Sequence, residues 1–365
     1  MTALLEARRV SKIFGGGLFD KSHTVALENF SFAIESAPPT ITAIVGESGS
    51  GKTTLARLLL GLVSPTSGQV LYDGKEIPKL TGGERRKFLR DVQMIFQDPY
   101  EVYNPFYRVD HVLETPIAEF KLADSPQARR TLIQDSLRAV GLRPEETLGR
   151  YPHQLSGGQR QRIMVARAVL IRPRLIIADE PVSMVDASLR ATILDSLRQL
   201  NRDYGISIIY ITHDLTTAFQ ISDNIIVLYR GSVAEAGNVE LVVQQPAHPY
   251  TQLLVGSIPQ PDPNHPWESL ENIAAMDTPA SLAVGAGTRA NGAKVRADTR
   301  IGCPFADRCP HTMDICRERT PGLFQINDRR VAACYLQRDN GPELSTEQLS
   351  DVMILAQSQS ATPSS

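Results

Sequence analysis

The pattern of apolar and polar positions predicts a mixed α/β protein. The first ~80 residues alternate apolar and polar positions in short runs broken by glycine, proline and Asp73-Gly74, which is typical of antiparallel strands and turns. Within them, the β-branched run 40–45 leads into a glycine-rich turn and then into the helical stretch 53–60. The order at this point is therefore strand, loop, helix.

Further along the chain the apolar spacing changes. Between about residues 105 and 168 it is helical, with Gly141 as a candidate C-cap, and it predicts a small helical subdomain. Two apolar runs, 175–178 and 206–211, flank the helical stretch 187–204. Strand, helix and strand in this order predict a parallel β-α-β unit, so we expect an α/β core.

The pattern weakens after Val243. Prolines recur from Pro246 to Pro266, and residues 283–294 are rich in alanine and glycine, so we expect a linker or a loose wrap. Near the end, Ser345 is a candidate cap for a short helix, and the Ser/Thr/Gln-rich residues 357–365 are expected to be disordered. One face of that helix would carry Leu349, Val352, Met353 and Ala356.

Composition excludes several classes of protein. The chain has 365 residues, 42% of them hydrophobic, and its 38 basic and 40 acidic residues nearly cancel, so any anion site must be local. No apolar run approaches the roughly 20 residues that cross a bilayer. The N-terminal segment has charges among its apolar residues and lacks the features of an export signal, so we expect a cytoplasmic protein.

A phosphate-binding motif occupies the predicted turn between strand and helix. Gly46-Glu47-Ser48-Gly49-Ser50-Gly51-Lys52-Thr53 fits the pattern G-x-x-x-x-G-K-[ST], and Thr54 follows it. The glycines let backbone N–H groups converge on phosphate oxygens, Lys52 supplies a point charge, and the Thr53 hydroxyl suits Mg²⁺. We therefore expect an ATP and Mg²⁺ site here.

Two carboxylates follow the apolar run 175–178. We expect Asp179 to bind Mg²⁺ through water, and Glu180 to orient or deprotonate the attacking water. Without the phosphate-binding motif, two solvated acids at the end of a strand would be the better interpretation.

Further motifs resemble one family, the ABC ATPases. Leu155-Ser156-Gly157-Gly158-Gln159 is the same as the signature of that family, which begins a helix and completes a nucleotide site on the opposite subunit. A plain helix N-cap is the alternative reading of this motif alone. The resemblance implies a P-loop NTPase (RecA-like) core with an antiparallel β subdomain and a helical ABC subdomain.

The same resemblance assigns roles to single residues. Gln97 resembles the family's Q-loop glutamine, which senses Mg²⁺ and water and faces the membrane subunits, and His213 resembles its switch histidine. Asp186 resembles the D-loop aspartate, although Met184-Val185 replaces the commoner Ala-Leu. Phe14 occupies the place of an adenine-stacking aromatic, with a buried core position as the alternative.

The segment Gln245-Pro246-Ala247-His248-Pro249-Tyr250-Thr251-Gln252-Leu253-Leu254 is similar to one that follows the ATPase core in oligopeptide/dipeptide-type importers. A proline-bounded helix start is the alternative interpretation of this segment. This similarity implies an ATPase subunit that pairs with a second, different ATPase chain on two permease subunits, served by an external solute-binding protein, at the cytoplasmic face of the membrane. Peptides are the expected cargo, with oligosaccharides or nickel chelates as alternatives. A soluble ABC ATPase of DNA repair or translation is the competing hypothesis.

The domain organisation follows from these motifs. We expect residues 1–245 to form the nucleotide-binding domain, with its helical subdomain at about 100–168. Residues 246–336 would form the importer-type extension, and 337–365 a partly disordered tail.

All four cysteines lie in that extension, as Cys303, Cys309, Cys316 and Cys334 with the spacing C-x5-C-x6-C-x17-C. A reducing cytoplasm disfavours disulfides, so a shared metal site is the main option. Zinc sites usually show closer pairs, whereas iron–sulfur clusters tolerate wider loops. Several peptide-importer ATPases carry a similar module with a 4Fe–4S cluster, so the resemblance also favours iron, with zinc as the alternative.

Overall fold

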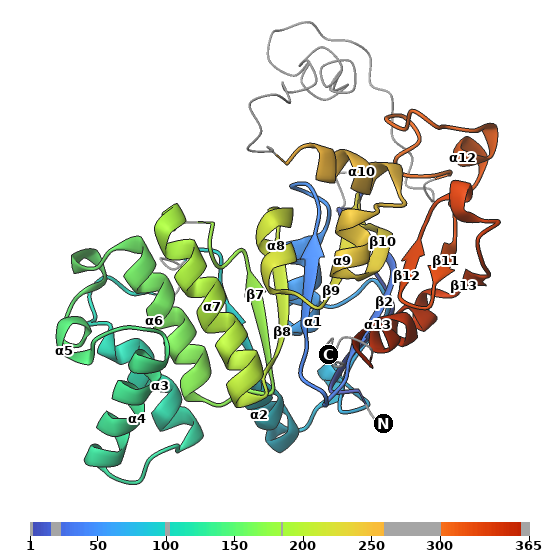
Figure 1. The fold of residues 1–365 in the computed structure, drawn as a ribbon. Coiled ribbons are helices and arrows are strands. Elements are labelled where there is room, and N and C mark those ends of the chain that lie inside the picture. The colour runs from blue at the N-terminus through green and yellow to red at the C-terminus, as the bar shows by residue number, and fades with distance from the viewer. Residues whose placement is uncertain (1–2, 16–22, 99–102, 184, 259–300, 359–365) are drawn as a thin grey trace, which may run out of the picture.

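The computed structural model describes residues 3–15, 23–98, 103–183, 185–258 and 301–358. A sheet of nine strands forms its centre, in the order β13-β11-β12-β10-β9-β3-β8-β7-β6 (Figure 1). The five strands from β9 to β6 pair in parallel, and the strands on the other side of β9 pair antiparallel. In chain order the strands are β3 (Ile41–Val45), β6 (Val92–Ile95), β7 (Leu175–Asp179), β8 (Ser207–Thr212), β9 (Asn224–Tyr229), β10 (Ser232–Asn238), β11 (Leu323–Asn327), β12 (Arg330–Ala332) and β13 (Glu343–Leu344).

A separate antiparallel sheet has the order β2-β1-β4-β5. Its strands are β1 (Leu5–Gly15), β2 (His23–Ile34), β4 (Ser67–Tyr72) and β5 (Lys75–Glu76). The turn at Asp73-Gly74 joins the last two strands, as the sequence predicts. This sheet and one face of the large sheet share a hydrophobic core with α1 (Lys52–Leu59), which follows β3 directly.

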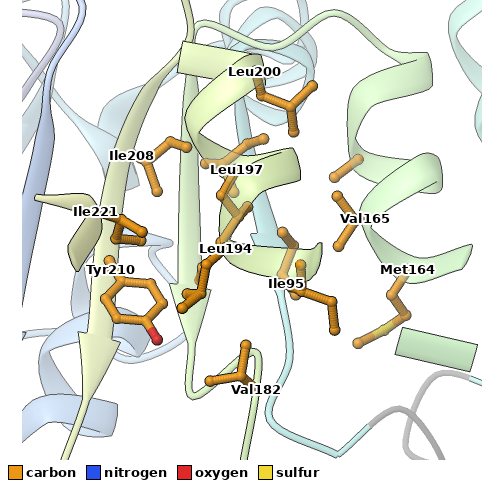
Figure 2. Packing of buried hydrophobic residues seen from close by; sticks show 14 of the residues in the cluster. Ile95, Met164, Val165, Val182, Leu194, Leu197, Leu200, Ile208, Tyr210 and Ile221 are labelled. Carbon is orange, nitrogen blue, oxygen red and sulfur yellow. The ribbon is translucent and has the colours of Figure 1, made fainter. Parts of the chain in front are cut away.

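The predicted β-α-β unit is confirmed. Strands β7 and β8 pair in parallel with Leu175 opposite Ser207, and α7 (Ala187–Tyr204) connects them. Figure 2 shows Leu194, Leu197 and Leu200 of α7 packed in the core between the strands and the neighbouring helix α6 (Gly157–Leu170). Their burial, at most 4% exposed, fixes α7 against the sheet and so sets the loop that follows β7.

Helices between β6 and β7 form the predicted helical subdomain on one side of the large sheet (Figure 1). Gly141 lies just beyond the C-cap of α4 with a φ of +69°, in the left-handed conformation common after a helix. The helices here are α3 (Asp110–Phe120), α4 (Pro126–Ala139), α5 (Pro144–Thr147) and α6, while α2 (Gly82–Asp91) precedes β6.

The C-terminal part is more ordered in its described residues than the sequence predicts. The expected linker is wrong for residues 249–256, which form α10 with Tyr250 fully buried. The short helix after Ser345 is confirmed, as a 3₁₀ turn and then α13 with Leu349, Val352 and Met353 buried. The remaining helices are α8 (Leu215–Ile221), α9 (Val239–Gln244), α10 (Pro249–Gly256), α12 (Asp314–Glu318) and α13 (Leu349–Ser358).

Strand β12 continues the large sheet by pairing with β10, and α13 packs on β2 and β10. The C-terminal extension therefore shares the large sheet with the preceding part of the chain and packs against it. Two predictions lie outside the described residues, the alanine- and glycine-rich stretch 283–294 and the end of the tail, 359–365. Among the described residues, no helix is both long and apolar enough to span a bilayer.

Candidate nucleotide-binding site

The predicted phosphate loop connects β3 to α1. Gly46 has a φ of +154°, and a Cβ there would meet the carbonyl oxygen of Leu228 at 2.1 Å. Gly51, with a φ of +105°, is similarly confined by the carbonyl of Ala26 at 2.3 Å. Only glycine fits both places, so the loop folds tightly and α1 begins without a side-chain cap on its N–H groups. Those N–H groups suit an anion.

Lys52 is buried at the start of α1. Its ammonium Nζ donates to the carbonyl oxygens of Gly46, at 2.6 Å, and Glu47, at 2.9 Å. Burial lowers its pKa, while nearby Glu180, Asp179 and Glu47 act in the opposite direction. The loop therefore holds the charge of Lys52 at its own centre.

Asp179 ends β7 and is 3% exposed. Burial raises its pKa, and a hydrogen bond from Thr53 opposes this change. Within the described residues, Asp179 Oδ1 and Ser50 Oγ are buried without a hydrogen-bond partner. These unpaired oxygens fit the Mg²⁺ and phosphate groups that the sequence predicts, because a buried oxygen without a partner is costly.

Glu180 follows Asp179 with a φ of +46°, a conformation that is rare for residues other than glycine. This turn directs its carboxylate between two predicted site residues. Gln97 Nε2 donates to Oε2 at 3.0 Å, and His213 Nδ1 lies 3.0 Å from Oε1. The structure thus brings together three residues that lie far apart in the sequence.

The signature motif begins α6. Ser156 and Gln159 cap the helix reciprocally, since the Gln159 N–H donates to Ser156 Oγ and the Ser156 N–H donates to Gln159 Oε1. Gly157 is the first residue of the helix. A Cβ on Gly158 would meet Leu189 Cδ1 at 2.7 Å, so this glycine permits close packing against α7. In Figure 1, α7, β7 and β8 separate α6 from α1, so one chain does not join its own signature to its own phosphate loop.

The other predicted residues lie around these two motifs. Asp186 is the exposed residue before α7, and its side chain does not cap that helix. Phe14 is 43% exposed on β1, with the Lys12 ammonium 5.1 Å from the ring centroid, so the alternative of a buried core position is wrong. Within the loop, Ser48 and Gly49 are exposed, while Thr54 lies in the first turn of α1.

Sequence reasoning missed two residues that contact the phosphate loop. The Tyr250 hydroxyl accepts a hydrogen bond from the Glu47 N–H at 2.9 Å, and Arg308 forms an ion pair with the Glu47 carboxylate at 3.0 Å. Tyr250 belongs to the quoted His-Pro-Tyr segment, and Arg308 lies among the cysteines. The segment alone gave no sign of where its tyrosine points.

A groove of about 890 Å³ lies between α2, α3 and the end of α6, and Gln93 of β6 and residues of segment 103–108 also line it. Its lining mixes apolar and basic side chains, among them Leu89, Tyr107, Phe120, Arg86 and Arg108. Next to it, Phe106 is 87% exposed. An apolar and basic groove of this size suits a segment of another protein.

The four cysteines line one small cavity of about 10 Å³ and form no disulfide. Burial raises the pKa of Cys334 to about 11, and the three other cysteines act in the same direction. No group of three or more His, Cys, Asp or Glu side chains in the described part of the chain is arranged to hold a metal ion. The four thiols thus border one cavity, but the described residues show no ligand set arranged for a metal ion.

Comparison with known proteins supports this picture of the site. Residues 27–183 match the family described as "ABC transporter", and residues 234–316 match "Oligopeptide/dipeptide transporter, C-terminal region". The second match covers the segment that contains Tyr250 and Arg308.

Individual relatives agree with both matches. The chain is 36% identical to a di/tripeptide transport ATP-binding protein of Pseudomonas aeruginosa, over 93% of this chain and 99% of the relative. It is 38% identical, over 86% of this chain and 82% of the relative, to a Sinorhizobium fredii protein named "Probable peptide ABC transporter ATP-binding protein". A solved dimeric structure of the ATP-binding cassette MJ0796 bound to ADP and Pi aligns with a TM-score of 0.56 at 29% identity, over 64% of this chain and 98% of the cassette. The chain therefore belongs to the ATP-binding proteins of the oligopeptide/dipeptide family of ABC transporters, and it is an ABC ATPase coupled to transport.

Proposed function

We propose that residues 46–54 bind MgATP, that Glu180 promotes its hydrolysis, and that this hydrolysis powers the import of peptides through an ABC transporter. The observation that carries the proposal is the position of Glu180. Its carboxylate is held by Gln97 and His213 beside a phosphate loop that already holds Lys52.

The chemistry follows from these positions. The oxygen of a water molecule bonds to the γ-phosphorus while the bond from that phosphorus to the bridging oxygen breaks, and Glu180 accepts the proton of the water. Lys52 and the N–H groups at the start of α1 stabilise the charge on the phosphates. Thr53, Gln97 and Asp179 would hold Mg²⁺, which neutralises phosphate charge when bound.

The signature residues Ser156, Gly157, Gly158 and Gln159, with Asp186, would serve the nucleotide of a partner ATPase subunit. The separation of α6 from α1 supports this, because α7, β7 and β8 lie between the two halves of a complete site in one chain (Figure 1). The solved cassette MJ0796 is a dimer. We favour a second, different ATPase chain over a second copy.

Two permease subunits and, indirectly, an extracytoplasmic solute-binding protein complete the proposed transporter, with this chain peripheral at the cytoplasmic face of the membrane. The groove, whose lining includes Gln93 and Tyr103 on either side of Gln97 in the sequence, would receive a cytoplasmic loop of a permease. Motion of that loop would reach Glu180 through Gln97, which donates to its carboxylate. Peptide transport in the names of the relatives supports a peptide cargo. Oligosaccharides and nickel chelates are the alternatives that a binding screen on the solute-binding protein would separate.

Co-purification tests the class of function. We expect the chain to purify from membrane fractions with hydrophobic partner chains. Purification with nucleic acid and without membrane partners would favour a soluble ATPase of DNA repair or translation instead.

We also propose that Cys303, Cys309, Cys316 and Cys334 ligate a 4Fe–4S cluster with a structural or redox-sensing role. All four thiols border the same cavity, which supports a shared ligand. Protein purified without oxygen should be brown and contain about four iron atoms per chain. Colourless protein with stoichiometric zinc and no iron would show that zinc occupies the module.

Two variants test the nucleotide site. Glu180→Gln should leave ATP binding intact and nearly stop hydrolysis, because the phosphate loop is unchanged while the proton acceptor is lost. Lys52→Ala should weaken binding itself. Nucleotide titrations and turnover measurements on both variants separate the two effects, and near-wild-type turnover of Glu180→Gln would exclude the proposed role of Glu180.

A further inference from the structure

Among the described residues, the hydrogen bonds and ion pair between the C-terminal extension and the phosphate loop all involve Glu47. The Tyr250 hydroxyl accepts from its backbone N–H at 2.9 Å. Arg308 Nη1 contacts both carboxylate oxygens, at 3.0 Å and 3.1 Å. The backbone carbonyl of Glu47 accepts from Lys52. The same carbonyl also accepts from the Ser50 N–H at 3.1 Å. Every polar group of Glu47 is thus bonded, and two of its four partners, Tyr250 and Arg308, come from beyond the ATPase core.

One peptide group connects Tyr250 to Lys52. The Glu47 N–H and the Gly46 C=O belong to the same peptide unit, which is planar with the two groups pointing in opposite directions. Tyr250 holds the N–H end, and the Lys52 ammonium donates to the C=O end at 2.6 Å. Fixing one end of this unit fixes the other, so Tyr250 determines where the carbonyl that holds Lys52 points.

The position of Tyr250 is itself closely determined. The side chain is fully buried, with its ring centroid 4.4 Å from that of Tyr229 and 5.6 Å from that of Phe305. Just before it, the His248 side chain caps α10 by accepting from the Tyr250 N–H at 3.0 Å. The hydroxyl is therefore placed by both packing and a helix cap.

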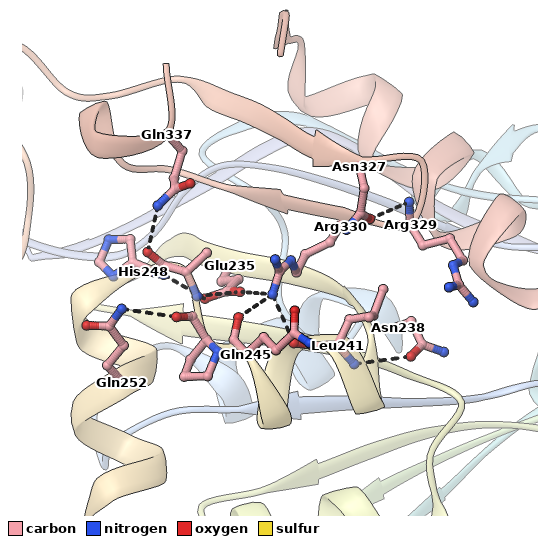
Figure 3. Close-up of polar contacts among 12 residues, drawn as sticks. Glu235, Asn238, Leu241, Gln245, His248, Gln252, Asn327, Arg329, Arg330 and Gln337 are labelled. Carbon is pink, nitrogen blue, oxygen red and sulfur yellow. Dashed lines mark hydrogen bonds and ion pairs between the residues drawn. The ribbon is translucent and has the colours of Figure 1, made fainter. Parts of the chain in front are cut away.

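A buried carboxylate anchors this turn (Figure 3). Glu235 on β10, which is 0% exposed, accepts from the N–H groups of Ala247 and His248. Arg330 on β12 lies 3.9 Å from Glu235 and donates to the carbonyl oxygens of Leu241 and Gln245. The start of α10 is thus tied to two strands of the large sheet.

Arg308 reaches Glu47 from the cysteine-containing segment. Its guanidinium lies 5.9 Å from the ring centroid of Tyr229 and 5.7 Å from that of Phe305. Phe305 also packs against Tyr250, so both contacts to Glu47 share one aromatic cluster. A guanidinium between rings is oriented at little entropic cost, which suits a two-oxygen contact.

We infer that Tyr250 and Arg308 are positioning residues for Lys52, through which the C-terminal extension sets the affinity of the phosphate loop for ATP. The inference rests on the nucleotide site proposed above. It gives the His-Pro-Tyr segment a physical role, in which the histidine caps the helix and the tyrosine orients the loop. Disorder in the cysteine-containing segment would then remove the contact of Arg308 with Glu47 and so weaken ATP binding.

The test uses the full chain in its transporter complex, with ATP turnover measured against MgATP concentration. Tyr250→Phe removes the acceptor oxygen but keeps the buried ring, and Arg308→Ala removes the ion pair. We expect each to raise the KM for ATP by about three- to tenfold while kcat stays within about twofold, since saturating ATP itself orders Lys52. Arg308→Lys should restore part of the loss.

Arg317→Ala is the matched control, because Arg317 lies in the same module. Among the described residues its guanidinium pairs only with the exposed Asp307, at 3.5 Å. Glu47→Gln combined with Arg308→Ala should raise KM no further than Arg308→Ala alone. The inference would be overturned if Tyr250→Phe and Arg308→Ala both kept the wild-type KM for ATP. It would also be overturned if Arg317→Ala raised that KM as much as they do. Intact ATP binding by Lys52→Ala would instead refute the nucleotide site on which it rests.

Discussion

Both carboxylate oxygens of Glu180 have a partner, and this fixes the direction in which the group accepts a proton. His213 holds one oxygen and Gln97 the other. We predict that His213→Ala lowers kcat by about 10²-fold and Gln97→Ala by about tenfold, because a freely rotating carboxylate aligns with the attacking water less often. ATP affinity, measured by titration, should change little in His213→Ala. Unchanged turnover in His213→Ala would mean that the contact with Glu180 has no part in hydrolysis.

At the residue scale, the sequence predicts those candidate site residues that belong to motifs with a fixed spacing. Lys52, Asp179 and Glu180 were predictable because phosphate and Mg²⁺ need particular groups at the ends of particular strands. Tyr250 and Arg308 were not, since 203 and 261 positions separate them from Glu47 and only the tertiary fold joins them. The left-handed backbone of Glu180 likewise depends on its surroundings, among them a hydrogen bond from its N–H to Ile211 O.

Among the elements, α10 depends on a neutral histidine. Burial lowers the pKa of His248 to about 4, from 6.5 in the unfolded chain, and its Nδ1 must stay unprotonated to accept from Tyr250. Between pH 4 and 6.5 the unfolded chain therefore binds the proton that the folded chain excludes. The free energy of unfolding should rise with pH across this window, by up to about 3 kcal/mol from this group.

Comparison with His248→Asn isolates the effect, because asparagine also caps helices but does not titrate here. Two charged groups face the same turn. Burial raises the pKa of Glu235, which acts in the opposite sense, and Arg330 lies beside it. Both remain in the variant. Denaturant unfolding from pH 4 to 7 should show a flatter profile for His248→Asn, and equal slopes in the two proteins would contradict the prediction.

The periodicity of apolar positions predicted the elements whose own sequence has a clear apolar pattern. Strands β7 and β8 are continuous apolar runs, and α7 has a long apolar face, so local sequence sufficed. Helix α10 was expected only as an alternative, because Pro246 and Pro249 resemble a linker, although Pro249 stands in its first turn, where proline is well tolerated. Strands β12 and β13, of three and two residues, exist only because a sheet edge is available to pair with them.

Over the whole molecule, the extension and the ATPase core form one structure. The large sheet runs from β6 in the core to β13 in the extension, and α13 packs on strands of both sheets. Composition placed the boundary at the proline-rich segment, but pairing between β10 and β12 crosses it. The phosphate loop therefore receives contacts from both parts of the chain.

The dependence of ATP turnover on subunit association tests the central claim most directly. Because Lys52 and Glu180 would serve one nucleotide and Ser156 another, a lone chain has two half-sites and no complete one. The account predicts that turnover per chain falls as the protein is diluted below the dissociation constant of the dimer, and that adding the partner ATPase subunit restores it. Full turnover by isolated monomer, independent of concentration and partner, would contradict the shared site.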